Sequence, residues 1–312
     1  MSQQALPRMA VDVAGIPCSN PVWTASGCAN YGRELGALFP LAELGALVVK
    51  GTAPEPWVGN PAPRITETSA GMLNAIGLQN PGVDHLLRED LPYLVAERAR
   101  VIVNIVGRTV EEYAAVARRL QAAPPGAVAG LELNISCPNV KEGGIQFGSD
   151  RTAAREVTAA VREATSLPLL VKLSPNVSDV AGFAAAVAES GADAVSLINT
   201  LVGMRIDVRR RAPVLANTTG GLSGPAVKPV ALRMVWEVAA AVSVPVVGIG
   251  GIETGLDAAE FLLAGAQAVQ VGTAIFRDPR APLRIRDELC AWLAAEGVTD
   301  VREIVGAARP RR

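Results

Sequence analysis

The segment Leu131-Glu-Leu-Asn-Ile-Ser-Cys-Pro-Asn-Val-Lys-Glu-Gly-Gly-Ile-Gln-Phe-Gly148 decides how the rest of the chain is interpreted. It begins in an apolar run, which predicts a buried strand. The strand must stop before Pro138, because proline has no N–H to donate to a sheet ladder. Cys137 therefore follows the strand end directly, flanked by Asn134 and Asn139. An isolated cysteine is most often inert core, but a thiol on a strand end, with amides and a glycine-rich loop beside it, indicates a barrel active site.

The composition is that of an ordinary globular chain. Its 312 residues are 50% hydrophobic and 19% charged, with a formal net charge of -1, and this length suits one large α/β barrel. A near-neutral charge argues against nucleic-acid or membrane-surface partners, which select basic patches. No apolar run is long enough to span a bilayer, and the N-terminal residues lack a signal-peptide pattern. We expect one domain, residues 1–312, in the cytoplasm.

Few residue types are left for acid–base chemistry. The single histidine, His85, lies in a polar stretch and is expected at a surface or helix start. A catalytic triad or a metal cluster based on histidine is therefore not expected. The four cysteines are scattered, with no CxxC pair: Cys18, Cys28, Cys137 and Cys290. This pattern indicates neither disulfides nor zinc or iron–sulfur ligands, and it fits a reducing compartment. We expect no metal site.

Eight apolar segments alternate with helix-like segments. The strand candidates are residues 22–25, 44–50, 101–106, 128–135, 168–173, 192–198, 244–249 and 268–271. Helices are expected over residues 33–42, 109–122, 149–164, 179–190, 229–241, 255–264 and 282–297. The alternation predicts a closed (β/α)8 barrel, the TIM-barrel fold. An open doubly wound sheet is compatible with the alternation alone, but no GxGxxG turn follows the first strand.

Two stretches interrupt this alternation. Residues 51–92 are rich in proline, glycine and asparagine without clear periodicity, and residues 199–227 form a second long connection. Excursions of this length in a compact domain are normally functional or form a small insertion. Because both follow strands, we expect long loops at the C-terminal face of the barrel.

The carboxyl ends of the strands carry polar side chains or glycines, and a barrel places its chemistry there. In chain order they are Ser26-Gly27, Lys50-Gly51, Asn104, Asn134 with Cys137, Lys172, Asn199-Thr200, Gly250-Gly251 and Gly272-Thr273. A lysine that emerges from an apolar strand must face a wet, charged pocket, since burial of an unpaired ammonium is costly. Lys50 and Lys172 are therefore candidate functional residues. The last two turns suit a phosphate, because glycines let backbone N–H groups approach it closely.

Longer motifs resemble one family, the class 1 dihydroorotate dehydrogenases, which are FMN-containing (β/α)8 enzymes of pyrimidine synthesis. They run in family order: Ala25-Ser-Gly27, Gly71-Met-Leu-Asn-Ala-Ile-Gly-Leu-Gln-Asn-Pro-Gly82, Val103-Asn-Ile105, Glu132-Leu-Asn-Ile-Ser-Cys-Pro-Asn-Val-Lys141, Val171-Lys-Leu-Ser-Pro-Asn176, Ile198-Asn-Thr200, Gly220-Gly-Leu-Ser-Gly-Pro-Ala226, Gly248-Ile-Gly-Gly-Ile252 and Val271-Gly-Thr273. Cys137 stands at the base position, where class 2 enzymes use serine.

The motif over residues 71–82 is similar to subclass 1B, whose catalytic chain works with a second subunit carrying FAD and a 2Fe–2S cluster and passes electrons to NAD. The resemblance implies a homodimer of this chain within a heterotetramer. Three alternatives stay open: a class 1A-like homodimer that reduces fumarate, a related flavin barrel acting on another pyrimidine or cyclic imide, and a flavin-free phosphate-binding barrel such as an aldolase.

The resemblance also implies roles. Cys137 takes the C5 proton of dihydroorotate while FMN takes the hydride, with Lys50 and Lys172 as the other catalytic residues, and residues 141–150 close over the substrate. One FMN per chain is expected to contact Ala25, Ser26, Gly27, Lys50, Gly51, Asn104, Asn134, Lys172, Ile198, Gly224, Gly250, Gly251, Gly272 and Thr273. The substrate is expected to contact Lys50, Asn74, Ala75, Ile76, Gly77, Leu78, Asn134, Asn139, Asn199 and Thr200. Two positions depart from the family: Gly51, where serine or threonine is usual, and Trp57, where arginine is common.

Overall fold

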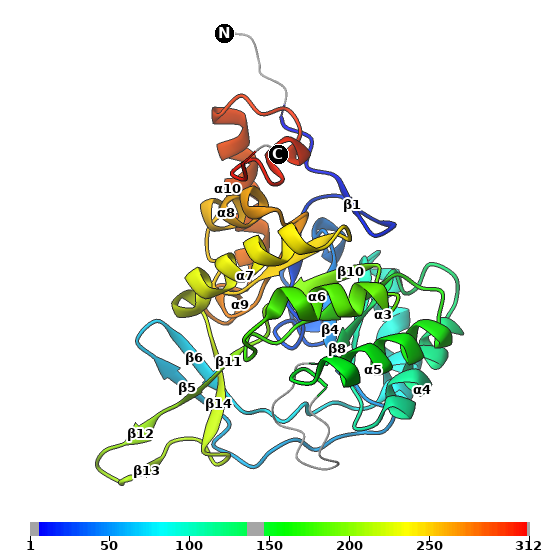
Figure 1. Ribbon diagram of the computed structural model, residues 1–312, viewed down its shortest axis with the longest axis vertical. Helices are drawn as coiled ribbons and strands as arrows, with labels where there is room; N and C mark the ends of the chain where they lie inside the picture. Colours follow the sequence, from blue (N-terminus) through cyan, green and yellow to red (C-terminus); the bar gives the residue numbers. More distant parts are fainter. Residues whose placement is uncertain (1–5, 136–146, 311–312) are drawn as a thin grey trace.

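Eight parallel strands close into a barrel in the computed structural model, which describes residues 6–135 and 147–310 (Figure 1). The strands are β3 (Val22–Thr24), β4 (Leu47–Thr52), β7 (Val101–Ile105), β8 (Gly130–Asn134), β9 (Leu169–Lys172), β10 (Ala194–Leu197), β15 (Val246–Ile249) and β16 (Ala268–Val271). Each pairs with the next in the chain, and β16 returns to β3, with Val269 beside Val22. The predicted (β/α)8 barrel is confirmed, and the open sheet is wrong.

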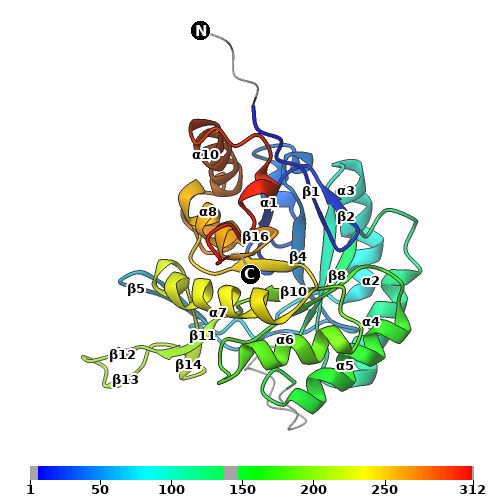
Figure 2. The ribbon, with the colours of Figure 1, turned by 45° about the horizontal axis from the view of Figure 1, so that its top comes forward.

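Helices surround this barrel (Figure 2). They are α4 (Val110–Gln121), α5 (Arg151–Ala164), α6 (Val180–Glu189), α7 (Lys228–Ala241), α8 (Gly255–Ala264) and α10 (Ala281–Ala295). Side-chain caps explain several starts, because they satisfy backbone N–H groups of the first turn. Thr109, Asp150 and Asp179 each accept such a bond, and Thr254 forms a capping box with Asp257. The long predicted helices are thereby confirmed within a few residues.

The helix predicted over residues 33–42 is wrong. The structure has a short α1 (Arg33–Gly36) and a separate 3-10 turn (Leu41–Glu43). Pro40 lies between them with an extended backbone. Proline has no N–H for an intrahelical bond, and its ring disfavours helical geometry in the residue before it.

The two long connections contain short strands that pair with each other, so they form a small insertion of the kind expected for residues 51–92. Residues 51–92 supply β5 (Ile65–Thr68) and β6 (Gly71–Asn74), and residues 199–227 supply β11 (Leu201–Met204) and β14 (Thr219–Ser223). These four strands form one antiparallel sheet in the order β11-β14-β6-β5, with Leu73 opposite Leu222. In Figure 1 this sheet lies beside the barrel, and β12 (Ile206–Asp207) with β13 (Ala212–Pro213) projects beyond it.

Smaller elements complete the fold. An N-terminal hairpin joins β1 (Val11–Val13) to β2 (Ile16–Cys18). After β6 come α2 (Val83–His85), a π-helical turn (Leu86–Asp90) and α3 (Leu91–Ala96), and 3-10 turns and a short helix lie near the C-terminal half: Pro225–Val227, α9 (Ala274–Arg277) and Val301–Ile304. His85 ends α2 with a side chain that is 43% exposed, as expected for a residue near a helix start. Across the described ranges, no helix has the length and apolar character needed to traverse a bilayer.

Candidate active site

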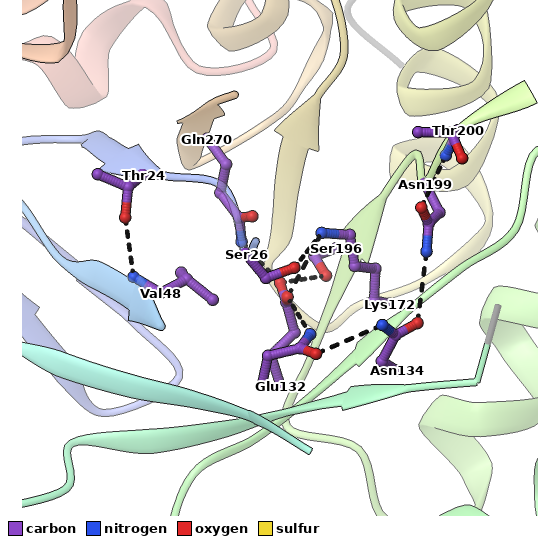
Figure 3. A network of polar contacts seen from close by, with 11 residues as sticks. Thr24, Ser26, Val48, Glu132, Asn134, Lys172, Ser196, Asn199, Thr200 and Gln270 are labelled. Atoms are coloured by element: carbon purple, nitrogen blue, oxygen red, sulfur yellow. Dashed lines mark hydrogen bonds and ion pairs between the residues drawn. The ribbon is translucent and has the colours of Figure 1, made fainter. Parts of the chain in front are cut away.

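A carboxylate, Glu132, lies at the centre of the polar groups inside the barrel (Figure 3). Its side chain projects from β8, and the residue is 0% exposed. Oε1 accepts a hydrogen bond from Asn104 Nδ2 at 2.7 Å, and Oε2 accepts from Ser196 Oγ at 2.9 Å and from Gln270 Nε2 at 2.7 Å. The ammonium of Lys172 lies 3.5 Å from Oε1. Buried carboxylates need such donors, since an unpaired charge inside a protein is very costly.

Lys172 is buried at the end of β9, with an exposure of 4%. Besides its ion pair with Glu132, its Nζ donates to Ser26 Oγ at 3.0 Å. Ser26 follows β3 on the other side of the barrel, so the bond joins two predicted cofactor residues across the interior (Figure 3). A lysine ammonium has three hydrogens, and these two contacts use two of them.

Three asparagines form a chain from the interior outward. Asn134 Nδ2 donates to Asn104 Oδ1 at 3.3 Å, and Asn199 Nδ2 donates to Asn134 Oδ1 at 3.3 Å. The Tyr113 hydroxyl donates to the Asn134 carbonyl at 2.8 Å and holds the end of β8 in place. Asn199 Oδ1 in turn accepts from the Thr200 N–H at 2.8 Å. The predicted amide set is therefore one connected group, with Asn104 fully buried and Asn199 partly exposed.

Lys50 lies near the end of β4 and is partly exposed. Burial lowers the pKa of its ammonium, and the charge of Arg64 lowers it further. Its neighbour Gly51 is tightly packed: a Cβ there would lie 3.1 Å from Asn104 Oδ1 and 3.7 Å from Leu78 Cδ2. The missing side chain at position 51 thus leaves room for Asn104 and Leu78 to approach the same strand end.

Glycines shape the side of the site next to the ends of β14 and β15. Gly224, Gly250 and Gly251 all have positive φ, at +96°, +127° and +75°, a region that other residues rarely adopt. A Cβ on Gly251 would lie 2.9 Å from the Gly224 carbonyl oxygen, so the turns after β14 and β15 are in contact. A Cβ on Gly250 would lie 3.4 Å from Ile198 Cγ1. The structure therefore brings these four predicted cofactor residues together.

The turn after β16 meets the one after β3. A Cβ on Gly272 would lie 3.3 Å from Ala25 Cβ and 3.4 Å from Cys28 Sγ. Thr273 Oγ1 donates to Ser223 Oγ on β14 at 2.8 Å. Burial raises the pKa of the Cys28 thiol to about 11, although Lys172 and Lys50 oppose this. Near neutral pH Cys28 is therefore a protonated thiol and not a base.

The predicted substrate segment, residues 74–78, starts on β6 and crosses to the barrel. Asn74 Nδ2 donates to the Gly221 carbonyl at 3.4 Å. The carbonyls of Ala75 and Ile76 accept from the Asn60 side chain and backbone, each at 3.0 Å. Gly77 has φ +73° and no room for a Cβ beside Asn60. Contacts with Asn60 thus hold this segment in place, and the Leu78 side chain reaches the end of β4 at Gly51.

Several predicted residues have other outcomes. Cys137, Asn139 and residues 141–146 of the predicted closing loop lie outside the described residues. Gly27 lies in the turn between Ser26 and Cys28 at φ +81°, and a Cβ at this position would have no neighbour within 4 Å. Trp57 stacks under the guanidinium of Arg108, whose Cζ is 4.9 Å from the ring centroid. The position that departs from the family is therefore occupied by a cation–π pair.

Sequence reasoning missed Glu132, Ser196 and Gln270. Each lies inside an apolar strand, whereas the strand ends are where a barrel places its chemistry. A signal was present, since a polar residue between two aliphatic ones, as in Leu131-Glu-Leu133, must find partners once it is buried. Their mutual pairing depends on β8, β10 and β16 facing one axis, which a single strand does not reveal.

A closed (β/α)8 barrel with a buried ion pair and an amide chain at the carboxyl ends of its strands defines an enzyme of the TIM-barrel class. The sequence profile of the family described as dihydroorotate dehydrogenase matches residues 8–293. A relative from Geobacter metallireducens, named dihydroorotate dehydrogenase B (NAD(+)), catalytic subunit, is 58% identical over 301 residues, which cover 96% of this chain and 98% of the relative. A relative of the same name from Alkaliphilus metalliredigens is 54% identical over 300 residues, with the same coverage of 96% and 98%. The chain belongs to the dihydroorotate dehydrogenase family.

A solved structure agrees on the fold. DHODH from Eimeria tenella, crystallised in complex with ferulenol, superposes with a TM-score of 0.79 over 100% of this chain and 91% of that one. The two sequences are 24% identical, so this likeness concerns the fold alone.

Proposed function

We propose that this protein oxidises dihydroorotate to orotate in pyrimidine biosynthesis, as the catalytic subunit of an NAD-linked dihydroorotate dehydrogenase. The names of its relatives support the reaction and the acceptor. The observation that carries the proposal is the buried Lys172–Glu132 pair joined to the chain Asn104–Asn134–Asn199. Amides that donate and accept at once suit the alternating edge of a pyrimidine ring.

The residues fit FMN as the cofactor. Gly224, Gly250 and Gly251 pack so closely that a Cβ on any of them would clash with neighbouring protein atoms, and glycine turns of this kind can present backbone N–H groups to a phosphate. Lys172, whose contacts with Ser26 and Glu132 use two of its three hydrogens, would offer the third hydrogen and its positive charge to the flavin ring. FMN, when bound, supplies a two-electron acceptor for the hydride from C6 of dihydroorotate.

The full set of proposed contacts follows the sequence-based assignment. For FMN it is Ala25, Ser26, Gly27, Lys50, Gly51, Asn104, Asn134, Lys172, Ile198, Gly224, Gly250, Gly251, Gly272 and Thr273. For the substrate it is Lys50, Asn74, Ala75, Ile76, Gly77, Leu78, Asn134, Asn139, Asn199 and Thr200.

Cys137 is proposed as the base that removes the C5 proton. A free thiol titrates near pH 8.5, so a small thiolate fraction is present at neutral pH. Cys28 is unsuited to this role, because burial raises the pKa of its thiol to about 11. Lys50 pairs with the substrate carboxylate, and its half-buried position strengthens that attraction by excluding water. Closure of residues 141–150 over the substrate would exclude water further.

Electron transfer to NAD needs a second protein in this proposal. The word subunit in the relatives' names supports a partner, which we propose carries FAD and a 2Fe–2S cluster. This chain would form a homodimer within the resulting heterotetramer and fold over residues 1–312 as one FMN-binding domain. A cytoplasmic location fits its scattered cysteines, of which Cys18, Cys28 and Cys290 are free thiols.

Anaerobic reduction tests the proposal. The purified protein, loaded with FMN, is mixed with dihydroorotate without oxygen, and absorbance in the flavin band is followed. We expect rapid bleaching with dihydroorotate and little with dihydrouracil, which lacks the carboxylate for Lys50. A protein that holds FMN but is not bleached would refute the substrate, and one that does not bind FMN would refute the cofactor. Adding NAD with the partner subunit, or fumarate alone, then identifies the acceptor.

A further inference from the structure

The Glu132 carboxylate in the barrel interior is surrounded by hydrogen-bond donors. We call Glu132 and the side chains that contact it the inner layer. Asn104 and Gln270 direct amide N–H groups at Glu132, at 2.7 Å each, and Lys172 directs its ammonium at 3.5 Å. The fourth neighbour, the Ser196 hydroxyl, donates at 2.9 Å. A protonated carboxyl group would set its own O–H against one of these donors, unless the Ser196 hydroxyl rotated or the Gln270 amide flipped to accept it. The observed arrangement, with two donors on each carboxylate oxygen, is the one that suits a carboxylate acting only as an acceptor.

The ammonium of Lys172 depends on this carboxylate. Lys172 is 4% exposed, and its other contact, the Ser26 hydroxyl at 3.0 Å, carries no charge. Glu132 is the one carboxylate within ion-pair distance of Lys172 in residues 6–135 and 147–310. Burial without a counter-charge favours the neutral amine of a lysine, often by several orders of magnitude in its acid dissociation constant.

We propose that Glu132 is a positioning residue that keeps Lys172 protonated and directed toward the flavin ring. This inference deepens the proposed function and rests on it in one respect, the presence of FMN beside Lys172. With Lys172 already charged, flavin reduction to its anionic form takes up two electrons and one proton. Without Glu132, Lys172 is neutral beside the oxidised flavin, and the new negative charge draws a second proton onto its amine.

Few other titratable groups face Lys172. The thiol of Cys28, in the turn after β3, interacts with Lys172 and with Lys50 on β4. It stays neutral, because burial raises its pKa to about 11. The side chains of β7, β10 and β16 that contact Glu132 are Asn104, Ser196 and Gln270, none of which titrates. Glu132 thus supplies the negative charge of this layer in the described part of the chain.

Glu132→Gln is the best-tolerated change that removes the charge. The new amide can keep its carbonyl oxygen toward Asn104 and Lys172, and turn its NH₂ toward Ser196 and Gln270. The Ser196 hydroxyl then rotates to accept, and the Gln270 amide flips, since its Oε1 has no hydrogen-bond partner among the described residues. Size and packing are preserved. The control is Ser196→Ala, which removes one neutral donor to the carboxylate and leaves the Lys172–Glu132 pair intact.

The test is the pH dependence of the flavin reduction potential, measured anaerobically against reference dyes with dithionite as reductant. We expect one proton per two electrons for the wild type and for Ser196→Ala, and two for Glu132→Gln over about pH 7 to pH 9. A count of one for Glu132→Gln, or a count of two for both variants, would overturn the inference. Because dihydroorotate is not used, failure of the proposed substrate leaves this result unaffected.

A second measurement needs no flavin. In the apoprotein of Glu132→Gln, unfolding releases Lys172 to water, where it binds a proton that the folded state lacks. The free energy of unfolding, relative to the wild type, must then rise with pH from about 7 to 10. If the difference in unfolding free energy between the two proteins stayed constant across that range, Lys172 would not have lost its proton in the variant. This result would refute the inference whether or not FMN is the cofactor.

Discussion

Replacing Lys172 by methionine tests the energetics of the barrel interior most directly. The change keeps a long, flexible side chain and removes the ammonium, so it leaves Glu132 buried with neutral donors only. At the observed separation of 3.5 Å, an effective dielectric constant of about 20 gives an attraction of about 5 kcal/mol. Breaking a buried pair by removing one partner commonly costs about 3–5 kcal/mol. Because three neutral donors remain, we expect the lower end of this range.

Urea unfolding of the apoprotein at pH 7, followed by circular dichroism, measures this loss. The deficit should narrow as the pH falls, because a protonated Glu132 no longer carries an unpaired charge. A double variant, Glu132→Gln with Lys172→Met, removes both charges and should recover most of the stability. The reasoning would be refuted by a Lys172→Met protein within about 1 kcal/mol of the wild type, or by a double variant no more stable than the single one.

Further predictions concern the site. Lys172→Ala should reduce the rate of flavin bleaching or the FMN affinity by at least about tenfold; unchanged stopped-flow and binding data would contradict its role. The wild-type bleaching rate should rise from about pH 6 to pH 9 as Cys137 ionises, and a flat profile argues against that base. Burial and Arg64 lower the pKa of Lys50, so the KM for dihydroorotate should rise with pH below the ordinary lysine range, and Lys50→Met should abolish this dependence. Gly251→Ala, at φ +75°, should weaken FMN binding about tenfold through strain of about 1–2 kcal/mol, measured by fluorescence. Gly126→Ala, at φ +79° with nothing within 4 Å, should cost stability but leave FMN binding unchanged.

The architecture of the barrel is determined locally, and that is why it was predictable. Each strand is a short apolar run buried on both faces, as expected for a parallel sheet covered by helices. Each such run alone identifies a strand, and its last residues identify the edge where side chains converge. Lys172, Asn134 and Asn199 could be placed together for this reason, and the structure joins them through Glu132 and Asn104.

What depends on partners far away in the chain was not predictable. The strands β6 and β14 are short and contain glycines. Their ladder hydrogen bonds come from each other, where Leu73 lies opposite Leu222, and from the neighbouring strands β5 and β11 of the same sheet. Their residues lack the alternation that marks an independent strand, so the sequence pattern alone does not predict them as strands. Gly224 and Gly251 meet in the same way, through turns on separate elements.

The sequence by itself therefore determined the barrel, its family resemblance and the residue types at its mouth, because burial periodicity and strand ends are properties of contiguous segments. Only the tertiary structure decided that Glu132, buried in mid-strand, collects donors from Asn104, Ser196, Gln270 and Lys172. These residues lie on five strands of the barrel and converge on Glu132 in its interior. Whether a buried charge is paired depends on closing the barrel, which no segment of the chain encodes alone.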